Sequence, residues 1–251
     1  PAPPALYTLS PPDALPLSPT PQLKSFYALT ATGSVDLIGI EGLTISAQNM
    51  TLEVNGGKPA GAPAINFQAT DFNSSLGGLQ PLLVVNTGPD ADQFVTLGFD
   101  EPLVRVTGFV ILTIDEFVHV SGYFAFEKGG TLSDVLLSDG TTLPNLSVLK
   151  VGASSVNAFV GLDGPYWIVD ETGTETVVRR PTASESTGSL GIVVSDVSFG
   201  LALLRELDTT TPRSFYALKA SGSVELVGVD GVTLSATEIS IEVNGGSGPA
   251  T

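Results

Sequence analysis

The chain of 251 residues holds one histidine, His119, and no cysteine. A catalytic triad or a histidine metal site would have to be built around His119, while disulfides, thiolate metal sites and a Cys nucleophile are excluded. Apolar residues occupy even-numbered positions along residues 103–130, so His119 falls on the polar side of a strand, across from Thr113. We therefore expect His119 to be a surface residue without a catalytic role.

Acidic residues are the next candidates, because glycoside hydrolysis uses two carboxylates that meet in space. Among 26 Asp and Glu residues, the ones that stand out recur in glycine-flanked segments, GIEG at 39–42, GLDG at 161–164 and GVDG at 228–231. A turn of a repeat must recur, whereas a catalytic pair need not, so we interpret these acids as turn residues. No nucleotide, hydrolase or metalloprotease motif occurs. We do not expect an enzyme; a β-helical glycosidase or lyase is the weakest alternative.

Calcium is the one cofactor that the sequence suggests. The segment DGPYWIVDETGTETVV at 163–178 is acidic and carries a glycine, and such loops supply hard oxygen ligands. Two threonines stand where stronger calcium loops place Asp or Asn, and no Glu follows at the EF-hand distance. The candidate ligands are Asp163, Asp170, Thr172, Thr174 and Glu175.

Two aromatic residues, Tyr166 and Trp167, lie in the same segment. Adjacent aromatic rings can form a platform on which a sugar stacks, so surface glycans are a possible ligand class. The alternative is that both rings cover the end of a β-sheet, which is the more frequent role of aromatic side chains in a loop.

Composition limits the partners of the chain. With 26 acidic and 10 basic residues the formal charge is −16, which repels nucleic acid and anionic membrane surfaces. No apolar run approaches the roughly 20 residues of a membrane helix, so we expect no membrane insertion. The absence of Cys, the low Lys content and the abundance of Gly, Thr, Ser, Val and Asp fit a secreted bacterial surface protein.

A long internal repeat is the strongest signal in the sequence. Residues 25–57 and 214–246 align without a gap at an offset of 189 (214 minus 25), and 20 of 33 positions are identical. Most of the differences exchange like for like, as Asp36 with Glu225 and Met50 with Ile239. This pattern indicates a tandem duplication of a β-rich unit.

The repeat suggests how the chain is divided. Residues 1–24 form a Pro-rich linker or strap, 25–213 a β-rich repeat unit and 214–251 the start of the next copy, and we expect the chain to be cut from a longer polypeptide. Residues 149–164 resemble 218–231 more faintly, so the unit is expected to contain smaller related units.

Patterning inside the unit predicts local structure. The alternation in the first copy shifts phase near Gln48, which indicates a β-bulge. The alternation along 103–130 requires a three-residue reversal at 115–117 that pairs Leu112 with Val120. VNGG, at 54–57 and 243–246, predicts a tight turn, and LALLRELD at 201–208 is a weak helix candidate.

The segments GSVDLIGIEGLTIS and GSVELVGVDGVTLS, with the closing VNGG, resemble the tandem β-rich repeats of very large bacterial surface and extracellular proteins. This resemblance implies a structural or adhesive role outside the cell, with calcium often rigidifying the repeats, and it implies no catalytic residues.

We expect an all-β fold with an elongated, solenoid-like or stacked-sheet repeat architecture; tandem β-sandwiches are the alternative, because both use short alternating strands. The predicted function is an acidic, self-assembling structural repeat of an extracellular fibre, filament or cell-surface array, whose partners are copies of itself. A carbohydrate-binding or adhesin-like β-module is the alternative function.

Overall fold

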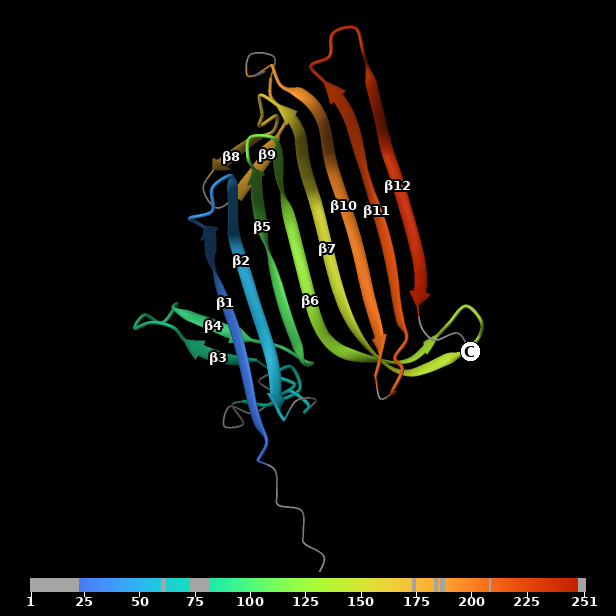
Figure 1. The fold of residues 1–251 in the computed structure, drawn as a ribbon. Helices are drawn as coiled ribbons and strands as arrows, with labels where there is room; N and C mark the ends of the chain where they lie inside the picture. The colour runs from blue at the N-terminus through green and yellow to red at the C-terminus, as the bar shows by residue number, and fades with distance from the viewer. Residues whose placement is uncertain are drawn as a thin grey trace, which may run out of the picture.

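The chain is all-β, as predicted (Figure 1). The computed structural model describes residues 23–59, 62–72, 82–172, 175–182, 185, 188–207 and 209–247. Within these ranges no segment is helical. The Pro-rich segment 1–22, most of the predicted strap, lies outside the described residues.

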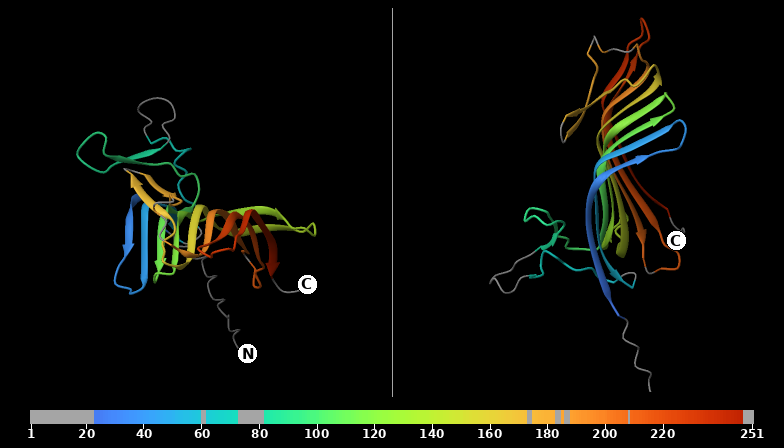
Figure 2. Two further views of the ribbon diagram at one scale, coloured as in Figure 1. Left: turned by 90° about the horizontal axis from the view of Figure 1, so that it is seen from above. Right: turned by 90° about the vertical axis from the view of Figure 1, so that its left-hand side faces the viewer.

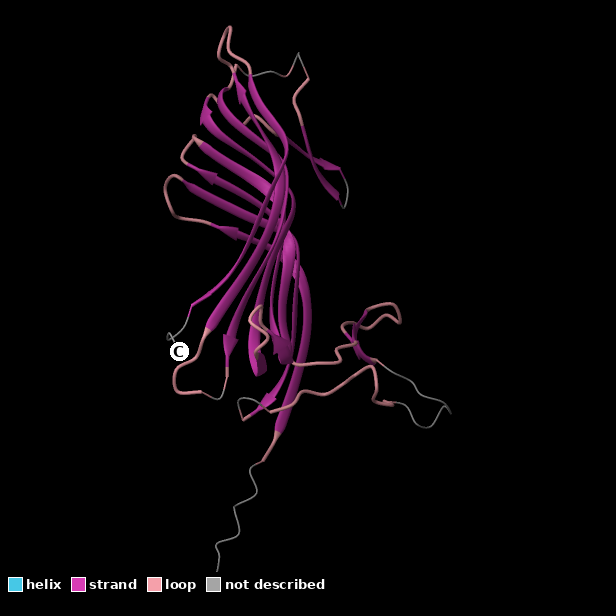
Figure 3. Ribbon diagram, turned by 90° about the vertical axis from the view of Figure 1, so that its right-hand side faces the viewer, coloured by secondary structure: helices cyan, strands magenta, loops and turns pink. Residues whose placement is uncertain are grey.

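One antiparallel sheet of eight strands forms the body of the molecule, in the order β1-β2-β5-β6-β7-β10-β11-β12. Each neighbouring pair is antiparallel, so the strands alternate in direction from one edge to the other. The sheet twists strongly along its strands (Figures 2 and 3). The eight strands are β1 (Ser25–Leu37), β2 (Leu43–Lys58), β5 (Leu103–Ile114), β6 (Val118–Leu136), β7 (Thr142–Leu162), β10 (Leu190–Glu206), β11 (Ser214–Val227) and β12 (Leu234–Ser247).

Two short hairpins lie on one face of this sheet (Figure 2). The hairpin β3 (Leu83–Asn86) and β4 (Phe94–Leu97) is inserted between β2 and β5, and the hairpin β8 (Ile168–Thr172) and β9 (Glu175–Arg179) between β7 and β10. Two clusters of buried apolar side chains form beneath them. One cluster contains Phe67, Leu97, Phe99 and Leu103, and the other contains Phe159, Trp167 and Val193.

The predicted reversal between β5 and β6 is confirmed. Ile114 pairs with Val118 around a three-residue turn, and Leu112 pairs with Val120. His119 lies across from Thr113, as expected, but its ring is half-buried and stacks on Phe159 with the centroids 6.3 Å apart. Its surroundings are those of a packed strand residue, and the Thr113 hydroxyl lies 3.4 Å from its Nδ1.

A row of β-bulges crosses the middle of the sheet. The predicted bulge near Gln48 is confirmed, because the register of β2 with β5 shifts between Gln48 and Thr51. Further register shifts occur in β7, β10 and β12. In each bulge one residue has a positive φ, which non-glycine residues rarely adopt. These residues are Asn49 (49°), Ser155 (50°), Asp196 (51°) and Glu238 (55°).

Glycines make room for these bulges. An added Cβ on Gly108 would lie 2.9 Å from Met50 Cγ, and on Gly222 it would lie 2.7 Å from Val197 Cγ2. Larger side chains at these two positions would clash with the bulged neighbour strand, so the glycines fix where the sheet bends.

The VNGG segments are not turns, contrary to the sequence prediction. Asn55, Gly56 and Gly57 continue β2 and pair with Ala28, Tyr27 and Phe26 of β1. An added Cβ on Gly56 would lie 2.8 Å from the Tyr27 ring, so the glycine leaves space for the aromatic ring to lie across the strand.

The helix prediction for residues 201–208 is also wrong for Leu201–Glu206, while Asp208 lies outside the described residues. Leu201–Glu206 form the end of β10, paired with β7 on one side and β11 on the other. Two flanking strands satisfy every ladder position of this segment, and that tertiary pairing overrides its local helix propensity.

The two faces of the sheet differ in chemistry. The face opposite the hairpins is apolar and largely uncovered; Phe126, for example, is 40% exposed there. One cross-strand row on this face runs through all eight strands: Ala31, Leu52, Val106, Phe126, Val151, Leu201, Leu218 and Val243. The other face carries charged residues between the two hairpins.

Candidate assembly interface at the sheet edges

The hairpins at the two ends of the sheet are copies of one another. Every residue pair of β1–β2 has a counterpart 189 residues later in β11–β12. For example, the pair Ser25–Lys58 corresponds to the pair Ser214–Ser247. The bulge recurs too, because Glu238 stands 189 residues after Asn49. The sequence repeat therefore encodes the same hairpin in the same register at both edges.

The packing of glycine against aromatic rings is repeated as well. Tyr216 lies over Gly245 as Tyr27 lies over Gly56; in both cases the ring is 2.7–2.8 Å from where a Cβ would stand. The two hairpins thus share their register and this glycine–aromatic packing, and they differ in their neighbours and in the ion pair of Lys219 with Glu242.

Each hairpin has one strand paired with the middle of the sheet and one at the edge. In the first hairpin β2 pairs with β5 and β1 is the edge, while in the second β11 pairs with β10 and β12 is the edge. Within the described residues, no strand pairs with the outer edges of β1 and β12. Unpaired edges present rows of N–H and C=O groups that can accept a further strand.

Strand β2 is the counterpart of β12, and its pairing with β5 shows which contacts form when a neighbour lies beside such a strand. Glu53 accepts a hydrogen bond from Arg105 of β5 at 3.0 Å. The Asn55 side chain is 3% exposed, and its Nδ2 donates to the carbonyls of Ile65 and Glu101, both at 2.9 Å. Both side chains therefore bind segments that follow β2 in the chain.

The counterparts on β12 lack these partners in the described structure. Glu242, the counterpart of Glu53, forms an ion pair with Lys219 at 2.8 Å, and its side chain is 66% exposed. Asn244, the counterpart of Asn55, is exposed. The side chains that hold a neighbour on β2 are thus present on β12 with that side open.

A charged ladder lies on the polar face beside β2. Arg105 contacts Glu53 and Glu127, and Lys150 of β7 contacts Glu127 at 2.7 Å. Hydrogen bonds from Lys150 and then Arg105 lower the pKa of Glu127, against the opposing effect of partial burial. This ladder joins four strands of the sheet, β2, β5, β6 and β7.

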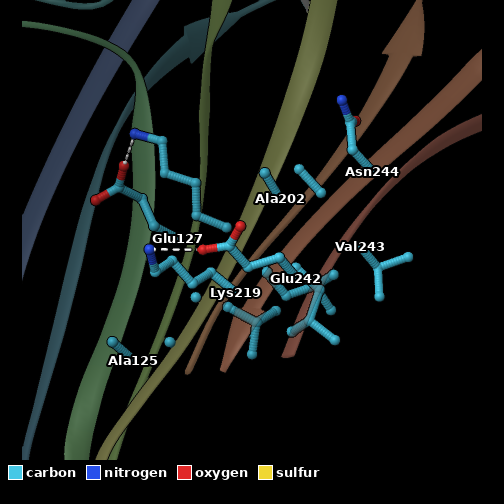
Figure 4. A pocket seen from close by; sticks show the side chains of 14 residues that line it. Ala125, Glu127, Ala202, Lys219, Glu242, Val243 and Asn244 are labelled. Atoms are coloured by element: carbon cyan, nitrogen blue, oxygen red, sulfur yellow. Dashed lines mark hydrogen bonds and ion pairs between the residues drawn. The ribbon is translucent and has the colours of Figure 1, made fainter. Parts of the chain in front are cut away.

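A hollow of about 850 Å³ lies where this ladder ends (Figure 4). Small residues form its floor, and the pairs Glu127–Lys150 and Lys219–Glu242 stand beside it (Figure 4). The floor residues are Ala125, Gly152, Gly200, Ala202 and Ala217. The hollow is an open stretch of the sheet face with no convergent set of catalytic groups.

The predicted calcium ligands are spread over several elements. Asp170 in β8 accepts a hydrogen bond from Arg179 Nε at 2.6 Å. Asp163 follows β7 with a φ of 52°, and its carbonyl accepts a hydrogen bond from Ser189. Thr172 and Glu175 form the last pair of β8–β9, and Thr174 lies outside the described residues. In the part of the chain that is described, no three His, Asp or Glu side chains gather as a metal site would require.

Tyr166 and Trp167 cover the sheet beneath the β8–β9 hairpin. Trp167 is 7% exposed, and its indole Nε1 donates to the Ala158 carbonyl at 3.0 Å. Tyr166 is half-buried and stacks on Phe159 with centroids 6.1 Å apart. Arg180 lies over the Trp167 ring at 5.6 Å. This packing leaves no free Trp167 face on which a sugar could stack.

Sequence reasoning identified the repeat but did not place its two copies at the opposite edges of one sheet. The sequence does not show how many strands of the main sheet the 189-residue offset contains. In the structure β11 stands six strands after β1 in the sheet. Because six is an even number and the strands alternate in direction, β11–β12 runs in the same direction as β1–β2 and forms the opposite edge.

A comparison with models of protein families, with curated proteins and with solved structures found no match for this chain. None of the described residues belongs to a helix that is long and apolar enough to cross a membrane.

Proposed function

We propose that the protein is a structural repeat that builds an extended β-sheet by joining its edges to further copies, as a subunit of an extracellular fibre, filament or surface array. One observation carries the proposal: the same 33-residue hairpin forms both ends of a single eight-stranded sheet, and both outer edges lack a partner strand in the described structure.

The chemistry of the described groups supports a structural role. The acidic side chains whose pKa is shifted, Glu127, Asp139, Glu185, Glu206 and Glu242, are all shifted downward by hydrogen bonds and ion pairs. A general acid of a glycosidase needs a raised pKa instead. The burial of Trp167 likewise favours the structural role over glycan binding at that loop.

The architecture we propose is a single continuous sheet that grows sideways, strand by strand, with the hairpins β3–β4 and β8–β9 repeated along one face. In this array each copy pairs its edge strands with those of the next copy. The formal charge of −16 keeps single copies soluble, and salt that screens this charge should promote assembly.

The test is electron microscopy and light scattering of the full chain over a range of concentrations. Filaments are expected for the wild-type protein and for Val177→Lys, which places a lysine on the exposed strand β9. They should be lost in Ile241→Lys, which places the same charge on the edge strand β12. Compact single particles for the wild-type protein at every concentration would overturn the proposal.

The same experiment addresses calcium at 163–178. Filaments that disappear in chelator and return with added calcium would support a bound cation in that segment. Filaments that persist in chelator would remove calcium from the assembly mechanism.

A further inference from the structure

We infer that the edge strand β12 pairs with β1 of a second copy in one defined register, in which Val243 faces Leu29 and Ser240 faces Thr32. This inference rests on the proposed assembly and adds which strands meet and how they align. It follows from two separate observations, one at each edge, that lead to the same alignment.

The first observation concerns the edge of β12. Its counterpart β2 pairs there with β5, and Gly108 of β5 lies beside the bulge at Asn49 and Met50. A strand added to β12 therefore needs a glycine beside the equivalent bulge at Glu238, because a side chain there would clash.

Strand β1 meets this requirement. Its segment Thr32-Gly33-Ser34-Val35-Asp36-Leu37 has the pattern of Thr107-Gly108-Phe109-Val110-Ile111-Leu112 in β5, at an offset of 75 (108 minus 33). Val54 pairs with Val104 in β2–β5. On β12 the counterpart of Val54 is Val243, at the offset of 189, and on β1 the counterpart of Val104 is Leu29, at the offset of 75. This first route therefore places Val243 opposite Leu29.

The second observation concerns the edge of β1. Its counterpart β11 pairs there with β10, and Leu218, the counterpart of Leu29, faces Leu201. Strand β12 can take the place of β10, because each has one bulged residue of positive φ, Asp196 in β10 and Glu238 in β12. When β10 and β12 are aligned on these two bulged residues, the offset is 42 (238 minus 196) and Leu201 corresponds to Val243. This second route therefore also places Val243 opposite Leu29.

Both routes also agree away from that pair. Phe199 faces Ala220 in β10–β11, and Leu52 faces Val106 in β2–β5. With the same offsets, both pairs correspond to Ile241 opposite Ala31. Two unrelated neighbours, β5 and β10, thus specify one alignment. A β12–β12 contact that aligns the two bulges lacks this property, because the glycines of β12, Gly245 and Gly246, lie at the end of the strand and away from Glu238.

The faces match across such a joint. The eight strands alternate in direction, so β1 of the next copy is antiparallel to β12. The apolar face would continue through Val243 with Leu29, Ile241 with Ala31, and Leu234 with Leu37. On the polar face Glu242 meets Thr30 and Ser240 meets Thr32, which brings no like charges together.

The absence of native cysteine makes this register testable by disulfide trapping in the full chain. Ser240→Cys protein would be mixed under mild oxidation with Thr32→Cys, Ala31→Cys or Thr30→Cys protein of distinguishable mass. A disulfide should accumulate with T32C only. Ala31 lies on the opposite face, and Thr30 is displaced by about 7 Å along the strand, beyond the reach of a disulfide.

The outcomes separate the two proposals. Accumulation with A31C or T30C, or a dominant disulfide between two S240C copies, would overturn the register while leaving the assembly of copies intact. Light scattering of each single-Cys variant under reducing conditions shows whether it still assembles. An absence of both assembly and disulfides would overturn the register together with the function on which it rests.

Discussion

The ring of Tyr216 lies across Gly245 of the neighbouring strand, as the ring of Tyr27 lies across Gly56. This pairing replaces the tight turn that Asn-Gly would otherwise form and keeps the strand extended. It also explains why the two copies of the hairpin retain the aromatic residue together with the glycine.

Replacement of Gly56 by Ala should therefore destabilise the fold. The new methyl group would meet the Tyr27 ring at 2.8 Å and force it off the strand, at a cost of about 1–3 kcal/mol. The unfolding midpoint in urea measures this change. Gly200→Ala is the matched control, because nothing lies within 4 Å of its added Cβ; equal losses in both variants would contradict the steric explanation.

The bulge at Glu238 predicts an effect of backbone conformation. Its φ of 55° is tolerated by Gly and Asn and strained for β-branched residues. Glu238→Val should lower the free energy of unfolding by roughly 1–2 kcal/mol, and Glu238→Asn should raise it by a few tenths to about 1 kcal/mol. Denaturant unfolding of both variants tests the sign. A Val variant as stable as the Asn variant would show that the bulge does not persist in solution.

The ladder around Glu127 predicts a pH dependence of stability. The pKa of Glu127 in the folded state is lowered from 4.5 by Lys150 and Arg105, so its contribution is present above pH 4.5 and is lost as the pH falls through the lower folded value. The unfolding midpoint should drop on acidification, and Glu127→Gln should flatten this dependence. Glu41→Gln, in the exposed turn after β1, is the control for the loss of one negative charge. A variant E127Q with the wild-type pH profile would exclude the ladder as its cause.

The single Trp167 gives a direct optical test of the β8–β9 hairpin. Because its indole is buried and hydrogen-bonded, we expect blue-shifted emission that acrylamide quenches weakly in the folded state and strongly after unfolding. Emission should not respond to added oligosaccharides. A saturable shift with one of them would favour the alternative function of glycan binding.

Much of the fold was predictable wherever a pattern depends on neighbours in sequence. Alternation placed Leu112 opposite Val120, and the phase shift at Gln48 located a bulge. Predictions failed where distant strands decide the conformation. Leu201–Glu206 are extended because β7 and β11 flank them, and Asn55 is buried by loops that follow β2.

The candidate interface was predictable only in part, for a physical reason. The repeat revealed that the ends of the chain share a hairpin, but an edge is a property of the whole sheet. Only the pairing of β2 with β5 and of β10 with β11 shows which side of each hairpin is open. The residue types at 163–178 predict ligands, but only the fold shows that Asp170 accepts a hydrogen bond from Arg179 and that Trp167 donates one to the Ala158 carbonyl.

The row of apolar residues that starts at Ala31 and crosses all eight strands ends at Val243. In the inferred joint Val243 faces Leu29 of the next copy, which lies two residues before Ala31, the residue at which the row of that copy begins. Two residues span about 7 Å and eight strands about 38 Å, which inclines the growth direction by about 10° to the hydrogen bonds. Together with the twist of the strands, this slip would make the proposed assembly a helical ribbon.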